Sequence, residues 1–418
     1  MLISRRLFAL TLTVGLLPVA ALDKGSVVKP ESVGLSTTRL RRITDAMKAD
    51  VAAEHVPGAL ALVARRGKVA YVETAGFADR EKQSPVRIDT IFRIYSMSKP
   101  ITSTGLMMLY EEGKFTLKDP VSKYIPEFAN LQVLEEDPGG NKLVKPKRPM
   151  TVQDLLRHTA GLTYGLFSKS AVDTMYEEVK PLSATVLDDF ITRLSKLPLR
   201  FHPGTQWHYS VAVDVQGKLI EALSGKRFDQ YLEERIFAPL GMKDTGFHVP
   251  KDKQNRFAAM YSPDKGGAHL QLAPGAMSRN FLNDDLTFFS GGGGLVSTAA
   301  DYLRFSQMML NGGELDGVRL LSRKTVDLMA SDHLGKIPGT QPTGYGFGLG
   351  FAVHTDPALS GLNGSKGEYN WSGLAGTKFW IDPVEKLIGI YMIQVLPPRS
   401  NPDPGNLFKQ LAYQAIAD

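Results

Sequence analysis

The chain has 418 residues, enough for two or three domains or one large domain with an insertion, and its 43% hydrophobic and 22% charged residues exclude disordered and fibrous classes. The net charge of +6 comes from lysines and arginines scattered among acids, so it does not indicate a nucleic-acid partner. There is no cysteine, which excludes disulfides, thiolate metal sites and a cysteine nucleophile.

Residues 1–21 predict an export signal. Two arginines precede an apolar run over residues 7–17, and small residues at positions 19–21 offer a cleavage point. Residues 4–8 also resemble the twin-arginine export pattern. The apolar run is too short to span a bilayer comfortably, and a short anchor is the alternative interpretation. We expect a periplasmic or secreted protein, with a cytoplasmic one as the alternative, and no stable membrane association after signal removal.

The next segments predict a helix, a hairpin and a second helix. Residues 35–54 place apolar side chains on one helical face, and residues 59–64 and 69–73 flank a turn as two short strands do. The second helix is predicted to begin at Ser96, because Pro100 is tolerated only in the opening turn of a helix.

The start of this second helix carries a candidate catalytic pair. Residues three apart share one helical face, so the amine of Lys99 can lie beside the hydroxyl of Ser96. Serine is a weak nucleophile that needs a neighbouring base, and a lysine serves as one where burial lowers its pKa. A helix N-terminus also offers N–H donors to an oxyanion. The Ser-x-x-Lys spacing fits a solvated first turn as well, so the rest of the chain has to decide.

Residues 116–283 predict a mainly helical insertion. Loop-rich runs precede short amphipathic patterns, the first with Thr151 as a candidate N-cap, and little in the segment alternates as a strand does. The helices that we expect here cover residues 151–157, 184–195, 211–223 and 228–236.

Strand-like patterns return towards the C-terminus. Three strands are predicted at residues 347–353, 376–381 and 386–395, and three helices at residues 299–310, 322–330 and 406–417. The economical architecture is an α+β fold in which one antiparallel sheet, flanked by helices, is built from both chain ends. The resulting division is an α/β subdomain of residues 22–115 and 284–418 with a helical subdomain of residues 116–283 inserted.

Two later segments carry further candidate site residues. Tyr209 follows a Pro/Gly turn at the start of a helix, where its phenol either relays a proton for a serine or simply packs. Residues 369–377 place small residues beside a strand, which fits either a second oxyanion donor opposite Ser96 or a plain β-bulge.

The Ser96–Lys99 pair, the Tyr209 segment and residues 369–377, in this order, resemble the serine β-lactamase and penicillin-binding-protein superfamily. More narrowly, they resemble the class C-like esterases known as family VIII carboxylesterases. The resemblance covers nearly the whole mature chain. The segments that carry it are residues 92–99, 151–162, 203–205, 238–242 and 292–301.

The resemblance implies a role for each matching residue. Ser96 resembles the acylated nucleophile and Lys99 its activating base. Tyr209 matches the tyrosine that shares the proton with the lysine and delivers it to the leaving group. The backbone N–H groups of Ser96 and Leu374 match the oxyanion hole of the family.

Two departures from the β-lactamase pattern bear on the substrate. Val211 stands where β-lactamases carry an asparagine that holds the substrate amide, and Trp371, Ser372 and Gly373 replace a Lys-Thr-Gly motif whose lysine meets the β-lactam carboxylate. Both changes leave apolar surface in place of polar anchors, so these residues are expected to bind a neutral, apolar ester. The resemblance thus implies a carboxylesterase for short to medium acyl chains that works through an acyl-enzyme. Weak β-lactam hydrolysis is compatible with the same machinery.

Other functions stay open at this point: a β-lactamase or D,D-peptidase, an acyltransferase, or a non-catalytic binding scaffold.

The sequence shows no motif of a metalloenzyme or of an α/β-hydrolase. The histidines are dispersed and His-Glu-x-x-His is absent, so we expect no metal, and no serine has the flanking glycines of an α/β-hydrolase. We expect no cofactor, and a small-molecule ester as the partner. We expect the backbone of residues 291–294 to approach the active site closely. We expect His158 to form a structural hydrogen bond. The oligomeric state stays open.

Overall fold

The structure is a computed structural model that describes residues 26–137, 140–166, 169–267, 269–273, 281–397 and 403–418. The predicted export signal lies outside the described residues. Within them, no helix combines the length and the apolar character that crossing a membrane requires.

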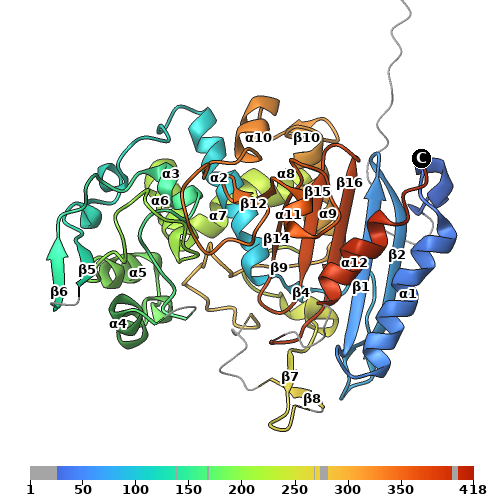
Figure 1. The fold of residues 1–418 in the computed structure, drawn as a ribbon. Helices are drawn as coiled ribbons and strands as arrows, with labels where there is room; N and C mark the ends of the chain where they lie inside the picture. Colours follow the sequence, from blue (N-terminus) through green and yellow to red (C-terminus); the bar gives the residue numbers. More distant parts are fainter. Residues whose placement is uncertain (1–25, 138–139, 167–168, 268, 274–280, 398–402) are drawn as a thin grey trace, which may run out of the picture.

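An eight-stranded antiparallel sheet forms the centre of the fold (Figure 1). Two neighbouring strands come from opposite ends of the chain, since β1 (Gly58–Arg65) pairs with β16 (Leu387–Met392). The complete order is β12 (Tyr345–Phe347), β13 (Ala352–His354), β14 (Tyr369–Ser372), β15 (Lys378–Asp382), β16, β1, β2 (Lys68–Asp79) and β3 (Ser84–Pro85). The predicted α+β fold, with a sheet built from both chain ends, is confirmed.

Helices cover both faces of the sheet. One face carries α1 (Thr37–Ala52) and α12 (Pro404–Tyr413), and the other shares a core with α2 (Ser98–Glu111) and α9 (Ala299–Leu310). Successive side chains of a strand point to opposite faces, so β1 feeds both cores. Its odd-numbered residues from Ala59 to Val63 pack towards α1, and Leu60 and Leu62 pack towards α2 and α9. This is why the whole strand is buried.

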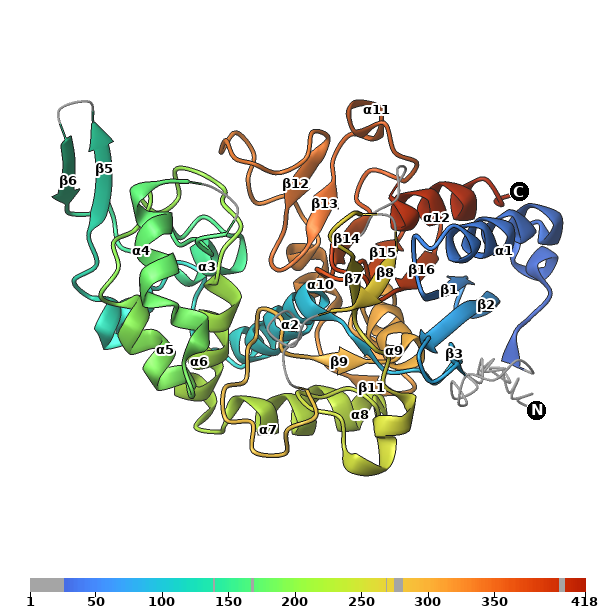
Figure 2. The same ribbon diagram turned by 90° about the horizontal axis from the view of Figure 1, so that it is seen from below.

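Further helices lie beyond α2, to the left of the sheet in both views (Figures 1 and 2). They are α3 (Val152–Leu156), α4 (Ala171–Val179), α5 (Leu187–Leu194) and α6 (Ala212–Ser224), and α7 (Phe228–Leu232) packs on α6. The helix predicted at residues 184–195 begins three residues later than expected, and α4 was not predicted. Because α2 packs on α6 as well as sharing the core of the sheet, it connects the two parts of the fold. The subdomain boundaries stay a prediction.

The strands differ from the expected ones at two places. The segment predicted to be mainly helical, with little strand alternation, also holds two hairpins, β5 (Val133–Asp137) with β6 (Gly140–Val144) and β7 (Tyr261–Pro263) with β8 (Leu270–Leu272). Most of β6 is exposed, so it lacks the apolar alternation that reveals a strand. The single strand predicted at residues 347–353 is instead β12 and β13, separated by a bend in which Gly350 has a φ of 98°.

Candidate active site

Ser96 lies in a tight turn at the entrance to α2. A 3₁₀ turn over Tyr95–Met97 precedes the helix, and Tyr95 has a φ of 41°, a strained conformation for a residue with a side chain. Ser96 is the second residue of this turn, a position whose backbone N–H has no acceptor within the turn. Ser96 lines a cavity of about 320 Å³. The strained turn therefore brings a hydroxyl and a backbone donor to the cavity wall.

Lys99 lies one helical turn further on and is only 1% exposed. Its Nζ donates a hydrogen bond of 3.1 Å to Ser96 Oγ and one of 2.6 Å to the carbonyl oxygen of Gly292. The same atom lies 4.6 Å from the ring centre of Tyr209 and 5.4 Å from that of Tyr164. The predicted contact between Ser96 and Lys99 is confirmed, and Gly292 provides the predicted close backbone approach.

The loop that carries Tyr209 is fastened to the segment that follows α3. Three of its backbone N–H groups donate to carbonyl oxygens of that segment, at 2.8 to 2.9 Å, and they belong to Arg200, Gly204 and His208, with Gly161, Thr159 and His158 as the acceptors. These hydrogen bonds place Tyr209 against the N-terminal end of α2, although about 110 residues separate it from Ser96 along the chain.

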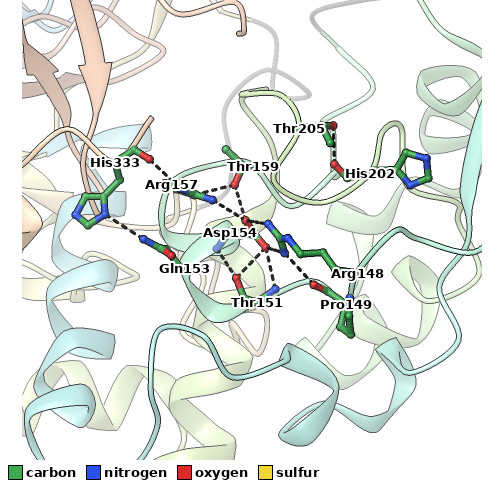
Figure 3. A network of polar contacts seen from close by, with 10 residues as sticks. All are labelled: Arg148, Pro149, Thr151, Gln153, Asp154, Arg157, Thr159, His202, Thr205 and His333. Atoms are coloured by element: carbon green, nitrogen blue, oxygen red, sulfur yellow. Dashed lines mark hydrogen bonds and ion pairs between the residues drawn. The ribbon is translucent and has the colours of Figure 1, made fainter. Parts of the chain in front are cut away.

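One buried carboxylate fixes the segment after α3 (Figure 3). Asp154 is fully buried and accepts hydrogen bonds from Arg148, Arg157 and Thr159, and it forms a capping box with Thr151, the predicted N-cap. Burial acts to raise the pKa of Asp154, but the hydrogen bonds from Arg148 and Thr151 outweigh it and hold this pKa below its usual value. The charged carboxylate thus anchors the frame that carries the Tyr209 loop.

Tyr209 lies in an aromatic cluster. Its ring centre is 5.3 Å from Tyr164, 5.0 Å from His158, 5.3 Å from Trp371 and 6.4 Å from Trp207, on which it stacks. In addition, Trp371 Nε1 donates a hydrogen bond of 3.4 Å to the Tyr209 hydroxyl oxygen. The structure therefore brings together Tyr209 and Trp371, which the sequence had placed in separate segments.

His158 has the predicted structural hydrogen bond, between its Nδ1 and Ser210 Oγ at 3.3 Å. Burial, together with the nearby charge of Lys99, holds the pKa of His158 well below its usual value. The imidazole is therefore neutral at physiological pH.

The end of β14 forms the opposite wall of the cavity, with Trp371, Ser372, Gly373 and Leu374 among the lining residues. A Cβ at Gly373 would lie 2.2 Å from Thr377 Oγ1 and 2.5 Å from a backbone oxygen, so only glycine fits there. The N–H of Gly373 donates to the Thr377 carbonyl at 2.7 Å, which closes the turn that places Leu374 at the cavity.

Two of the predicted site residues, Lys99 and Val211, do not line the cavity. Lys99 still contacts Ser96 at the cavity wall, whereas Val211 has no such contact. Val211 is 1% exposed, lies at the N-cap of α6 and packs in the core. Conversely, the cavity wall includes Tyr164 and Asp214, which the sequence did not single out. Asp214 lies five residues after Tyr209, but only the path of α6 decides which side chain of that helix turns to the site.

No group of three histidine, aspartate or glutamate side chains in the described ranges is arranged to hold a metal ion. His202 and His208, the pair closest in sequence, have separate partners, Glu135 and Thr163.

Known proteins are similar to this chain in fold and in sequence. The beta-lactamase family profile matches residues 43–414. Protein Rv1367c of Mycobacterium tuberculosis is 37% identical over 82% of this chain and 87% of its own length, and esterase EstB of Burkholderia gladioli is 32% identical over 78% and 82%. The solved structure of EstCE1, a hydrolase with promiscuous acyltransferase activity, matches with a TM-score of 0.77 at 26% identity, over 90% of this chain and 99% of that one. The chain therefore belongs to the β-lactamase family, among the serine hydrolases that include the family VIII carboxylesterases.

Proposed function

We propose that this serine hydrolase cleaves neutral carboxylic esters with short to medium, apolar acyl chains through a covalent intermediate on Ser96. The observation that carries this proposal is the hydrogen bond of 3.1 Å between the buried Lys99 amine and the Ser96 hydroxyl, beside a cavity. An amine in this position can take the serine proton and so create the nucleophile. The similarity to esterase EstB supports an ester as the substrate.

In the acylation step, Ser96 Oγ attacks the ester carbonyl carbon while its proton moves to Lys99 Nζ. The carbonyl oxygen takes up the displaced electron pair, and the N–H groups of Ser96 and Leu374 stabilise the negative charge, each contributing about 3 kcal/mol in comparable sites. Tyr209, whose ring lies beside Lys99, passes the proton to the leaving alkoxide as the carbon–oxygen bond breaks. The alcohol leaves, and Ser96 keeps the acyl group.

In the second step, a water molecule attacks the acyl carbon and gives up its proton to the same basic groups. The bond between Ser96 Oγ and the acyl carbon breaks, Oγ regains a proton, and the carboxylic acid leaves. The net reaction is the addition of water across the ester bond.

The cavity wall favours neutral and apolar substrates. Leu166 and Leu374 line it with 71% and 51% of their surface exposed, and Trp371 contributes apolar surface beside them. Covering such surface with an acyl chain contributes roughly 25 cal/mol per Å². Among the described residues, no lysine or arginine lines the cavity, whereas Asp214 does, so an anionic substrate finds no charge partner at the wall.

Two alternatives use the same residues. A β-lactamase or D,D-peptidase would need polar partners for a charged amide, and Trp371 stands where a lysine would supply one. An acyltransferase would admit an alcohol in place of water in the second step, and the similarity to EstCE1, described as promiscuous in this respect, supports such transfer as a side activity.

A substrate panel tests the proposal. The protein is incubated with p-nitrophenyl acetate, butyrate and longer esters and, in parallel, with a chromogenic cephalosporin. We expect turnover of the esters to exceed that of the cephalosporin, with a preference for short to medium chains. The reverse order would make the protein a β-lactamase, and no turnover of any ester would refute the proposal. Adding a primary alcohol and measuring the transfer product tests the acyltransferase alternative.

We also propose that the chain is exported. The support is the arginine pair and the apolar run within residues 1–21. N-terminal sequencing of the natively produced protein, together with cell fractionation, tests this. A protein that keeps residue 1 and stays in the cytoplasm would contradict it.

A further inference from the structure

Asp214 is a buried carboxylate at the active site with no part in the mechanism above. It is the third residue of α6 and is 1% exposed. Its Oδ1 accepts hydrogen bonds from the backbone N–H of Gly292, at 3.1 Å, and from Ser290 Oγ, at 2.5 Å. Its Oδ2 has no hydrogen-bond partner among the described residues, although the side chain lines the cavity.

Gly292 connects this carboxylate to Lys99. Its N–H donates to Asp214 Oδ1, and its carbonyl oxygen accepts the hydrogen bond of 2.6 Å from Lys99 Nζ. A Cβ at position 292 would lie only 2.5 Å from Asp214 Oδ2, so the carboxylate packs directly on the glycine backbone. Neither Asp214 nor Lys99 forms an ion pair in the described part of the chain. Two buried groups of opposite charge therefore share one residue as their link.

We propose that Asp214 is a positioning residue that acts on Lys99 through Gly292. Its negative charge stabilises the protonated form of Lys99, and its hydrogen bond holds the Gly292 carbonyl against the amine. Lys99 then keeps one N–H on that carbonyl, so that its lone pair can face the Ser96 hydroxyl whose proton it takes. This inference rests on the proposed roles of Ser96 and Lys99 and adds the group that sets the pH range in which they work.

The physical reason is a balance between burial and charge. Burial without a counter-charge makes a lysine neutral but also a weak base, which is poorly suited to receive a serine proton. A carboxylate that is linked to the amine through one intervening residue offsets part of the cost of protonating the lysine in the low-dielectric interior. The two hydrogen bonds to Oδ1 hold the carboxylate of Asp214 in place at the N-terminal end of α6.

The other ionisable side chains that face this pair in the described ranges are two tyrosines and one histidine. Tyr164 and Tyr209 place their rings beside Lys99, and His158 packs behind Tyr209 with a pKa that burial and the Lys99 charge hold well below the usual value. Among the described residues, Asp214 is the acid that lines this cavity. Removing its charge therefore changes the electrostatic field at Lys99 while leaving every ring in place.

The test compares kcat/KM for p-nitrophenyl butyrate across the pH range in wild type and in Asp214→Asn. Asparagine keeps an oxygen for the Gly292 N–H and the Ser290 hydroxyl but removes the charge. We expect the acidic limb of the profile to move to lower pH by on the order of one unit, because protonated Lys99 loses its stabilisation. We also expect a lower plateau, because the base is weaker. A limb that stays in place or moves to higher pH overturns the proposal.

Three further variants separate charge from structure. Ser290→Ala removes a hydrogen bond to the same carboxylate and keeps its charge, so its limb should stay near that of wild type. Asp214→Glu keeps the charge and should also retain the wild-type limb. Asp214→Ser, neutral and smaller, should show the same shift if the asparagine variant fails to fold. If wild type hydrolyses no ester, the proposed function fails; if it does and the neutral variants keep its limb, only this inference fails.

Discussion

The indole Nε1 of Trp371 donates a hydrogen bond of 3.4 Å to the hydroxyl oxygen of Tyr209, and their ring centres lie 5.3 Å apart. The sequence motif suggested only that Trp371 takes the place of a lysine and leaves apolar surface. The structure shows that it also supplies an N–H donor, directed at the tyrosine of the site. One residue therefore both shapes the cavity wall and orients Tyr209.

Trp371→Phe keeps an aromatic ring at this position and removes the donor. A hydrogen bond between neutral groups contributes about 0.5–1.5 kcal/mol, so we expect kcat for p-nitrophenyl butyrate to fall about two- to tenfold. Steady-state kinetics with separate kcat and KM values measures this.

Trp207→Phe is the matched control. Trp207 stacks on the same tyrosine with an interplanar angle of 21°, and its Nε1 has no hydrogen-bond partner among the described residues. Its replacement removes an N–H that Tyr209 does not use, so kcat should stay within about twofold of wild type. Equal losses in the two variants would show that ring packing, and not the hydrogen bond, orients Tyr209.

Lys99→Met and Tyr209→Phe test the proton transfers. Methionine fills the buried space of Lys99 without an amine, and phenylalanine keeps the ring of Tyr209 in its cluster. Each change should lower kcat by about 10²- to 10⁴-fold, the usual contribution of a general acid or base. Ser96→Ala should abolish turnover, and mass spectrometry of wild type quenched during turnover should find the acyl group on Ser96. Retention of more than about a tenth of the activity in Lys99→Met would exclude it as the base.

Asp301, the third residue of α9, predicts a pH dependence of stability. Burial raises its pKa to about 6, so between about pH 4 and pH 6 the folded state holds a proton that the unfolded state has lost. The free energy of unfolding therefore falls as pH rises through this window. Asp301→Asn keeps an acceptor oxygen and cannot ionise. The free energy of unfolding of Asp301→Asn minus that of wild type should increase by about 2 kcal/mol between pH 4.5 and pH 7.5. Urea denaturation of both proteins at both pH values measures this difference.

Asp154→Asn tests a buried carboxylate whose pKa is shifted in the opposite direction to that of Asp301. Asp154 occupies the same position in α3, but its pKa is lowered, because Arg148 and the capping box outweigh burial. At a pH above its pKa in the unfolded chain, Asp154 is charged in both the folded and the unfolded state. Its contribution to the free energy of unfolding is therefore constant from pH 4.5 to pH 7.5 and is lost only as pH falls further. The substitution should cost about 3 kcal/mol throughout that window. A cost that changes steeply inside it would contradict this account.

Gly373→Ala tests the turn that carries Leu374. The added Cβ meets Thr377 Oγ1 and a backbone oxygen at well under 3 Å, so the turn must shift and move the Leu374 N–H away from the cavity. We expect kcat to fall by about 10²-fold, the effect of losing one oxyanion donor. Gly246→Ala is the control, since its Cβ would make only an ordinary contact at 3.8 Å. A fully active Gly373→Ala protein would remove Leu374 from the proposed oxyanion hole.

Features that depend on neighbours along the chain were predictable from the sequence. Ser96 and Lys99 meet because residues three apart share a helical face, and Thr151 caps α3 because its partner Asp154 is three residues away. The long amphipathic helix α1 and the hairpin of β1 and β2 were visible in their apolar periodicity. The exposed hairpin of β5 and β6 was not, because exposed strands need no apolar alternation.

Contacts between distant segments were decided by the tertiary structure. Trp371 and Tyr209 are 162 residues apart, and Lys99 reaches Gly292 across 193, so no local pattern joins them. The same holds for Val211 and Asp214, three residues apart on the same segment, of which one packs in the core and the other lines the cavity. The amino-acid sequence determined which chemical groups are available and the local turns that hold them. Packing of α6 and the glycine loop against α2 decided which of those groups meet, because side-chain direction depends on how whole elements dock.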